Sequence, residues 1–170
     1  MDELAKKIKT AAYLEGHFVL RSGKTSNYYL DKYLFETQPD ILRELAVRFS
    51  KFVDESVDLI GGAELGGVPL AAAVALQTNK PFIIIRNSKK DYGTSKQFEG
   101  PNPNGKRVLL VEDIATTGGQ VLEAAKSLTT AGAKVKKIIA VIDRQEGARE
   151  NIENAGFAFE SLFKKSDLGI

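Results

Sequence analysis

The chain has 170 residues, of which 43% are hydrophobic and 27% charged, ordinary values for one globular domain with a single core. Its 24 basic and 22 acidic side chains leave a formal charge of +2, too balanced to indicate nucleic-acid or membrane-surface binding. It contains no cysteine, which excludes disulfides, a thiolate nucleophile and thiolate metal sites and is compatible with the cytoplasmic location that we expect.

The N-terminal part alternates charged and apolar residues and lacks the uninterrupted apolar stretch of a signal peptide. We expect a helix over residues 3–15, short strands at Phe18–Leu20 and Tyr28–Leu30, and a helical stripe over residues 40–53. The longest apolar run, Val68–Leu76, is far too short to span a membrane.

From residue 57 onward, short apolar runs alternate with helical patterns. We predict strands at Asp58–Ile60, Pro81–Ile85, Arg107–Val111, Lys136–Ile142 and Phe157–Leu162, and helices at Val68–Gln77, Gly119–Ala131 (closed by Gly132) and Glu146–Ala155. Continuous apolar strands of this kind are typical of a parallel sheet covered on both faces. The sequence therefore predicts an α/β fold, in which ligands bind beyond the carboxyl ends of the strands.

One long segment, Asn87–Asn104, has no regular pattern and contains several lysines, glycines and prolines. A segment this long without structure is typical of a lid or of disorder. A lysine-bearing lid that closed on an anionic leaving group would exclude water and strengthen the electrostatics. We interpret it as such a lid, with a floppy insertion as the alternative.

The most informative stretch is VLLVEDIATTGG, residues 108–119, in which an apolar strand runs into Glu112 and Asp113. The turn that follows, Ala115–Gly119, opens a helix, so its free N–H groups and the helix dipole can hold a phosphate. Carboxylates would repel that phosphate on contact, but one step away they can accept hydrogen bonds from sugar hydroxyls or hold a Mg²⁺ shell. The combination predicts a site for a phosphorylated sugar, and the alternative is a plain strand–turn–helix with solvated acids.

Two glycine motifs do not support nucleotide-binding classes. Gly23-Lys24-Thr25 is not the end of a P-loop, because Phe18 stands where that motif requires glycine. GGAELGG fails the GxGxxG pattern at Ala63 or Glu64, so a nicotinamide cofactor is poorly supported.

Several stretches, in family order over residues 15–165, resemble the type I phosphoribosyltransferases and within them the orotate phosphoribosyltransferase family. VLLVEDIATTGG resembles the signature for phosphoribosyl diphosphate (PRPP). FVLRSGKTSNYYLD (18–31) resembles the orotate-side segment, and GGAELGGVP (61–69) occupies the place of the pyrophosphate loop. RNSKKDYG (86–93) resembles the mobile catalytic loop, and VIDRQEGA (141–148) resembles the DRQE segment. The resemblance implies one domain over residues 1–170, with a small hood mainly from residues 1–35 on a core of about 40–165.

The implied reaction transfers ribose 5-phosphate from PRPP to N1 of orotate, giving orotidine 5′-monophosphate and pyrophosphate in pyrimidine biosynthesis, with Mg²⁺. Positive charge would develop at C1′, so catalysis would come chiefly from positioning and from stabilising the departing pyrophosphate. The implied partners are PRPP, orotate and a second copy of the chain in a homodimer with shared active sites, without nucleic acid or membrane.

The resemblance also assigns residues. It places the ribose hydroxyls at Glu112 and Asp113, and the 5′-phosphate at Ala115, Thr116, Thr117, Gly118 and Gly119. It places the pyrophosphate at Arg86, Lys90, Tyr92, Glu64 and Leu65, and names Lys90, Asp113 and Arg86 as catalytic. It assigns orotate binding to Arg21, Tyr29, Leu30, Thr117 and Arg144. Mg²⁺ is expected to bind through PRPP and water near Asp113, with no certain protein ligand.

Some of these residues also have plainer interpretations. Arg21 and Arg144 could be ordinary surface arginines, the loop lysines could be solvated, and one of Tyr28 and Tyr29 could be a core aromatic. We interpret His17, the single histidine, as structural.

Four positions depart from the pattern of several family members. Gly66 and Asn87 stand where those members carry lysines, Tyr92 replaces a histidine of the mobile loop, and Arg21 replaces a lysine. Fewer positive charges would then hold the pyrophosphate, and Tyr92 cannot donate a proton near neutral pH as histidine can.

Two other functions share the PRPP signature. A purine phosphoribosyltransferase would use the same site, but Arg21 and Arg144 favour an anionic pyrimidine. A PRPP-sensing regulator that binds RNA or DNA would need a basic face, of which the overall charge of +2 gives no sign.

Overall fold

The computed structural model describes all residues except 20–22, 24 and 88–96. Its first elements are α1 (Glu3–Ala12), β1 (Tyr13–Val19), β2 (Thr25–Leu30), α2 (Lys32–Glu36) and α3 (Pro39–Ser50). The remaining elements are β3 (Leu59–Ala63), α4 (Gly67–Thr78), β4 (Phe82–Ile85), β5 (Phe98–Glu99), β6 (Arg107–Ala115), α5 (Gly119–Thr130), β7 (Lys134–Asp143), α6 (Ala148–Asn154), β8 (Phe159–Lys164) and the 3₁₀ helix η1 (Lys165–Leu168). None of the described helices is both long and apolar enough to cross a membrane.

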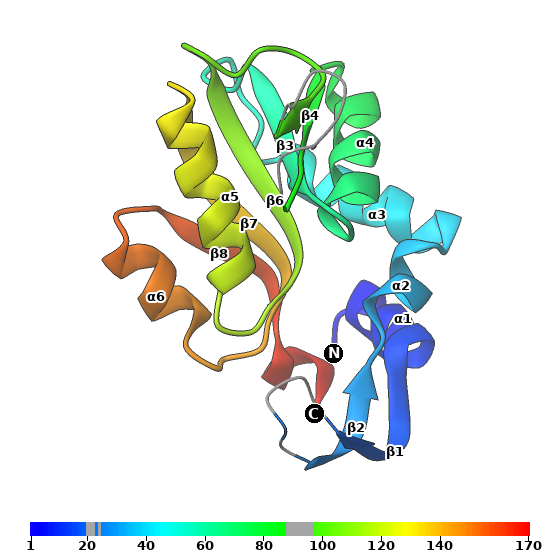
Figure 1. Cartoon of the computed structure of the whole chain (residues 1–170). Coiled ribbons are helices and arrows are strands. Elements are labelled where there is room, and N and C mark those ends of the chain that lie inside the picture. Colours follow the sequence, from blue (N-terminus) through cyan, green and yellow to red (C-terminus); the bar gives the residue numbers. More distant parts are fainter. Residues whose placement is uncertain (20–22, 24, 88–96) are drawn as a thin grey trace.

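A six-stranded sheet in the order β5-β4-β3-β6-β7-β8 forms the centre of the molecule (Figure 1). The strands β4, β3, β6, β7 and β8 are parallel, and β5 joins the edge strand β4 antiparallel. The predicted α/β fold with a mostly parallel sheet is confirmed. Because β3, β6 and β7 are parallel neighbours, the segments that follow them meet at one end of the sheet, where the carboxyl ends of the strands lie.

Helices cover both faces of this sheet, with α5 and α6 on one face and α3 and α4 on the other (Figure 1). Alternate residues of β6 serve the two faces: Leu109 and Val111 pack with α3 and α4, whereas Val108 and Leu110 pack with α5 and α6. The nearly continuous apolar strands seen in the sequence therefore fill two cores at once.

We call α1, β1, β2 and α2 together the hood. Leu4 and Ile8 of α1 are fully buried in the same cluster as the α3 and α4 core. The Asp2 side chain caps α1 and also pairs with Arg48 of α3 at 2.8 and 2.9 Å. At the other end of the chain, Lys9 Nζ donates to the Gly169 carbonyl at 3.1 Å. The hood is therefore packed against the core and not attached by a linker alone.

Several predicted boundaries of the hood were wrong. The first helix ends at Ala12 and not at residue 15, because Tyr13, Leu14 and Glu15 pair with the antiparallel strand β2. The second strand begins at Thr25 and not at Tyr28, and the short helix α2 had no prediction.

Two errors in the core concern the site. The strand β6 does not stop at Val111 but continues to Ala115, because Glu112 and Ile114 still pair with Ala140 and Ile142 of β7. Within the predicted lid, Phe98–Glu99 pairs with β4, and residues 88–96 lie outside the described structure.

Close contact between β3 and α4 requires glycine at position 62. A Cβ atom there would lie 2.2 Å from the Gly67 carbonyl oxygen and 2.8 Å from the Ala71 Cβ atom. Moving the backbone or the packed helix aside would cost free energy, so the segment between β3 and α4 is held tightly in place.

We expect Gly62→Ala to lower the free energy of unfolding by roughly 1–3 kcal/mol or more, through overpacking. Chemical denaturation measures the change. Gly119→Ala is the matched control, because its Cβ would meet no atom closer than 3.7 Å. Equal stability of the two variants would contradict the tight β3–α4 contact.

Candidate active site

A cleft of about 1010 Å³ lies at the carboxyl end of β6, between the hood and the core. It is lined by Val19, Tyr29, Lys32, Glu112, Asp113, Ile114, Ala115, Thr116, Thr117, Gly118, Gly119, Gln120, Val121, Arg144 and Glu146. The structure thus brings the predicted phosphate turn, both predicted acids and three of the predicted orotate residues (Tyr29, Thr117 and Arg144) to one cavity.

The phosphate turn is built by the end of β6 and the start of α5. Gly118 has a φ of 77°, and a Cβ there would lie 3.0 Å from Ile152, so both the backbone conformation and the packing require glycine. The Asn151 amide donates to the Thr117 carbonyl at 2.9 Å and fixes the turn against α6. The turn exposes the first N–H groups of α5, whose dipole favours an anion.

The acid pair is buried and not solvated. Glu112 and Asp113 are 7% and 1% exposed, and the Asp113 amide donates to Glu112 Oε1 at 3.0 Å. Burial first, and then the neighbouring Asp113 charge, raises the pKa of Glu112 above its ordinary value. The alternative of two solvated acids is therefore wrong.

Lys32 of α2 reaches across from the hood to this pair. Its Nζ lies 2.7 Å from Asp113 Oδ2. Burial, the largest single influence, would lower the pKa of Lys32. The charge and hydrogen bond of Asp113, with smaller contributions from Tyr33 and Glu112, together outweigh burial, so the pKa is raised and the lysine stays charged. This ion pair joins the hood to the central strand.

A third carboxyl group, Glu36, lies behind this ion pair. It is 1% exposed, and neither of its oxygens has a hydrogen-bond partner among the described residues. Burial, and next the charge of Asp113, raises its pKa to about 9. Glu36 is thus neutral at physiological pH.

Sequence reasoning missed Lys32 and Glu36. Their only local signal is the spacing of four residues, which places both on one face of α2. Nothing in the sequence indicated that this face meets Asp113.

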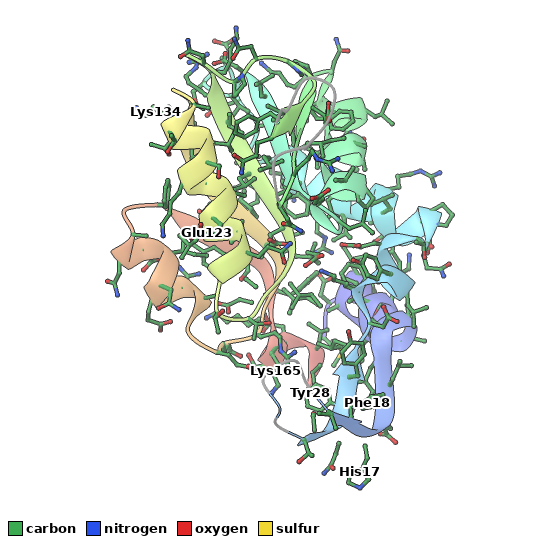
Figure 2. All side chains as sticks on the ribbon, in the orientation of Figure 1. His17, Phe18, Tyr28, Glu123, Lys134 and Lys165 are labelled. Atoms are coloured by element: carbon green, nitrogen blue, oxygen red, sulfur yellow. The ribbon has the colours of Figure 1, made fainter. Side chains whose placement is uncertain are left out.

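The hood side of the cleft carries aromatic residues. Tyr29 lines the cleft, and its ring lies 5.6 Å from the Phe18 ring. Tyr28, by contrast, stacks on Tyr13 at 5.5 Å and lies beneath Lys165 Nζ at 5.3 Å (Figure 2). Of the two tyrosines, Tyr28 is therefore the packing residue and Tyr29 the one available to a ligand.

The other predicted orotate residues have different surroundings. Arg144 lines the cleft, and its Nε lies 3.1 Å from Glu146 Oε1, so it is not a free surface arginine. The side chain of Leu30 is buried in the core, which leaves only its backbone for a ligand. Arg21 lies outside the described residues. His17 is exposed at the far end of the hood (Figure 2) and does not line the cleft.

A second cavity, of about 430 Å³, adjoins the cleft, because Gly119 and Gln120 line both. Arg86 lines this second cavity, whereas Lys90 and Tyr92 lie outside the described residues. Leu65 is exposed and follows a cis peptide bond with Glu64, and neither of these two residues lines the cleft or the second cavity.

Gln120, which sequence reasoning also missed, connects the segments around this cavity. Its amide donates to the Glu64 carbonyl at 2.8 Å and to Asn87 Oδ1 at 3.3 Å. Glu64 Oε1 in turn accepts from the Asn87 amide at 2.6 Å. The first turn of α5 is thereby tied to the ends of β3 and β4.

The mostly parallel sheet, the phosphate turn and the buried acid pair define a phosphoribosyltransferase of type I. In agreement, residues 35–166 match the model of the phosphoribosyl transferase domain. The orotate phosphoribosyltransferase of Pyrococcus horikoshii is 48% identical over 171 residues, which cover 98% of this chain and 92% of that protein.

Solved structures agree. That of the Mycobacterium tuberculosis H37Rv orotate phosphoribosyltransferase in complex with Fe(III) dicitrate has a TM-score of 0.89 and 30% identity, over 99% of this chain and 98% of that one. The same enzyme in complex with PRPP gives a TM-score of 0.80 and 29% identity, over 99% and 98%. The chain therefore belongs to the orotate phosphoribosyltransferase family.

Glu36 predicts a pH dependence of stability. The folded state keeps its proton up to about pH 9, whereas the unfolded chain releases it near the ordinary value of 4.5. Since the folded state binds more protons between these values, the free energy of unfolding falls as the pH rises through them. We expect Glu36→Gln to remove this fall and to stabilise the protein by roughly 3 kcal/mol at pH 7.

Denaturation of Glu36→Gln and of the parent chain from pH 5 to pH 9 measures this dependence. Glu150→Gln, which changes an exposed carboxylate on α6, is the control for the loss of one negative charge. A stability difference for Glu36→Gln that does not grow with pH would contradict the buried, protonated state.

Proposed function

We propose that the chain transfers ribose 5-phosphate from PRPP to N1 of orotate, producing orotidine 5′-monophosphate and pyrophosphate. One observation carries this proposal: the glycine turn at the start of α5 lies beside a buried acid pair in a cleft whose other wall is aromatic and basic. Family membership supports the same reaction, and we treat residues 1–170 as one domain that acts in the cytoplasm.

The PRPP side follows from charge. The turn Ala115–Gly119 would hold the 5′-phosphate through N–H groups and the hydroxyls of Thr116 and Thr117. Glu112 and Asp113 lie in β6 just before this turn. In PRPP the ribose is attached to the 5′-phosphate, so these two acids would face the ribose. Their hydrogen bonds to the 2′ and 3′ hydroxyls would fix C1′ for attack, and the negative charge would favour the positive charge that develops there.

The pyrophosphate would extend into the second cavity, which Arg86 lines, and toward the backbone of Glu64 and Leu65, as the family resemblance implies. Arg86 has a buried Nε with no hydrogen-bond partner among the described residues, which is a donor available to an anion. We propose that Lys90 and Tyr92 act on the same group, as the family resemblance implies.

The site residues also suit Mg²⁺. Glu112 and Asp113 supply the hard oxygen atoms that this ion prefers, but the described residues contain no cluster of three or more His, Cys, Asp or Glu side chains that could hold a metal. Mg²⁺ bound to diphosphate oxygens and water would fit this arrangement, and when bound it neutralises the leaving pyrophosphate. Asp113 would contact it through water.

On the base side, orotate would lie between Tyr29 and Arg144, with Arg21 as a further cation. Arginine can pair its planar fork with a carboxylate or a carbonyl edge, and a tyrosine face suits a flat ring. These groups support orotate over an uncharged purine, which offers no carboxylate to the guanidinium of Arg144.

We expect purified protein to consume orotate only when PRPP and Mg²⁺ are both present. Loss of orotate absorbance measures the forward reaction, and omission of PRPP or addition of a chelator gives the controls. Turnover of hypoxanthine, guanine or adenine with orotate left untouched would contradict the assignment of the base.

We further propose a homodimer in which Lys90 acts in the active site of the partner. Lys90→Ala and Asp113→Asn should each leave only a small residual activity. If Lys90 acts across the interface, a heterodimer of the two variants has one site with both defects and one intact site. Random exchange at equal amounts makes half of the dimers mixed, so about a quarter of the parental activity should return.

Native mass spectrometry must show that heterodimers formed. With heterodimers present, no return of activity would mean that Lys90 acts within its own chain. A monomer would contradict the shared sites outright.

A further inference from the structure

The Lys32–Asp113 ion pair lies where the proposed reaction needs a defined carboxylate. Asp113 is 1% exposed, and its two oxygens have separate partners: the Ile114 amide donates to Oδ1, and Lys32 Nζ lies 2.7 Å from Oδ2. Each carboxylate oxygen has two lone pairs, so a hydroxyl can still be accepted after both contacts form. The pair therefore fixes the orientation of Asp113 without closing it to a sugar.

The surroundings of Asp113 make this cation necessary. Two more buried carboxyl groups, Glu112 and Glu36, interact with Asp113 electrostatically, and both are disfavoured as anions by burial and by its charge. A buried carboxylate without a partner takes up a proton and stops acting as an anion. Lys32 supplies the positive charge in contact with this group of carboxyls, at 2.7 Å from Asp113 Oδ2.

Lys32 is also held so that it cannot easily turn elsewhere. Its Nζ lies 5.3 Å from the centre of the Tyr33 ring, which is within cation–π range. Glu36 is on the same face of α2, but the order lysine-then-glutamate is the weaker orientation for a pair four residues apart. A neutral Glu36 competes even less, so Lys32 remains with Asp113.

The space around Asp113 leaves little room for another arrangement. A Cβ on Gly66 would lie 1.6 Å from Asp113 Oδ2 and 3.3 Å from Glu36 Oε1. Gly66 has an ordinary helical φ of −65°, so the need for glycine is a matter of space and not of backbone conformation. The oxygen that Lys32 holds thus packs directly over the segment between β3 and α4.

We propose that Lys32 is a positioning residue for PRPP, which holds the Asp113 carboxylate in a fixed orientation for the ribose hydroxyls. This inference rests on the proposed function, because it assumes that Asp113 faces the ribose. It adds a residue of the hood to the PRPP side of the cleft, so that the hood serves both substrates.

Lys32→Met tests the proposal, because it keeps an unbranched side chain of similar length and removes the charged group. We expect kcat/KM for PRPP to fall by about 10-fold to 100-fold, the loss that a charge-assisted hydrogen bond implies. The rise in KM for PRPP should exceed the change in kcat, and the Kd of orotate, measured by calorimetry, should change less than about twofold, because the defect is confined to the ribose side.

The matched control is Lys126→Met, which breaks an exposed lysine–glutamate pair on α5 with Glu123 at 3.4 Å. It should leave kcat/KM unchanged. Lys32→Gln provides a second variant that keeps a hydrogen-bond donor without the charge, and it should show the same defect as Lys32→Met. Lys32→Gln also replaces Lys32→Met as the test variant if thermal denaturation shows that Lys32→Met does not fold.

A double-mutant cycle separates positioning from direct contact. If Lys32 acts through Asp113, Lys32→Met should lower kcat/KM by less than about twofold in an Asp113→Asn background. Fully additive losses would mean that Lys32 contacts PRPP itself, and would overturn the proposal, as would a Lys32→Met variant that behaves like Lys126→Met.

Activity of the parent chain distinguishes failure of the proposed function from failure of the proposed role of Lys32. Without orotate turnover by the parent chain the proposed function fails, whereas an active parent with an unaffected Lys32→Met variant refutes only the role of Lys32.

Discussion

One lysine among three buried carboxyl groups is the constraint on which the arrangement of this molecule depends. Glu112 and Asp113 belong to the central strand, but Lys32 comes from the hood. If Lys32 were moved away from Asp113, these buried acids would have no counter-charge in an apolar environment, which costs several kcal/mol. The position of the hood is therefore set by electrostatics as well as by the apolar packing of α1, because α2 must place Lys32 over Asp113.

The sheet order explains how distant segments meet at this point. The strands β3, β6 and β7 are adjacent and parallel, so their carboxyl ends lead into the Glu64 segment, the phosphate turn and Arg144 respectively. Gln120 then joins two of these segments through the Glu64 carbonyl. A ligand with a phosphate at each end suits two cavities that share the first turn of α5, since both cavities are lined by Gly119 and Gln120.

Local patterns predicted the parts of this structure that depend on neighbouring residues. The apolar strands, the helices around them and the turn after Asp113 were predicted because their signals lie within a dozen residues. The cluster of Lys32, Glu36 and Asp113 could not be predicted, because α2 has only five residues and its partner is far along the chain. The extension of β6 was missed for the same reason: charged residues normally end a buried strand, and only the tertiary partner makes Asp113 tolerable inside one.

Glu36 shows why such a site is costly to maintain. A buried carboxyl group with a pKa of about 9 and without a described hydrogen-bond partner opposes folding at neutral pH, and an apolar residue in its place would satisfy the core better. Departures of this kind from the rules of packing are expected at functional sites. At this position the neutral carboxyl fills the volume beside Gly66 without adding a second anion, so Lys32 stays paired with Asp113. The same group that weakens the fold thus adds no second anion beside Lys32, so the contact between the hood and the carboxyl end of β6 stays with Asp113.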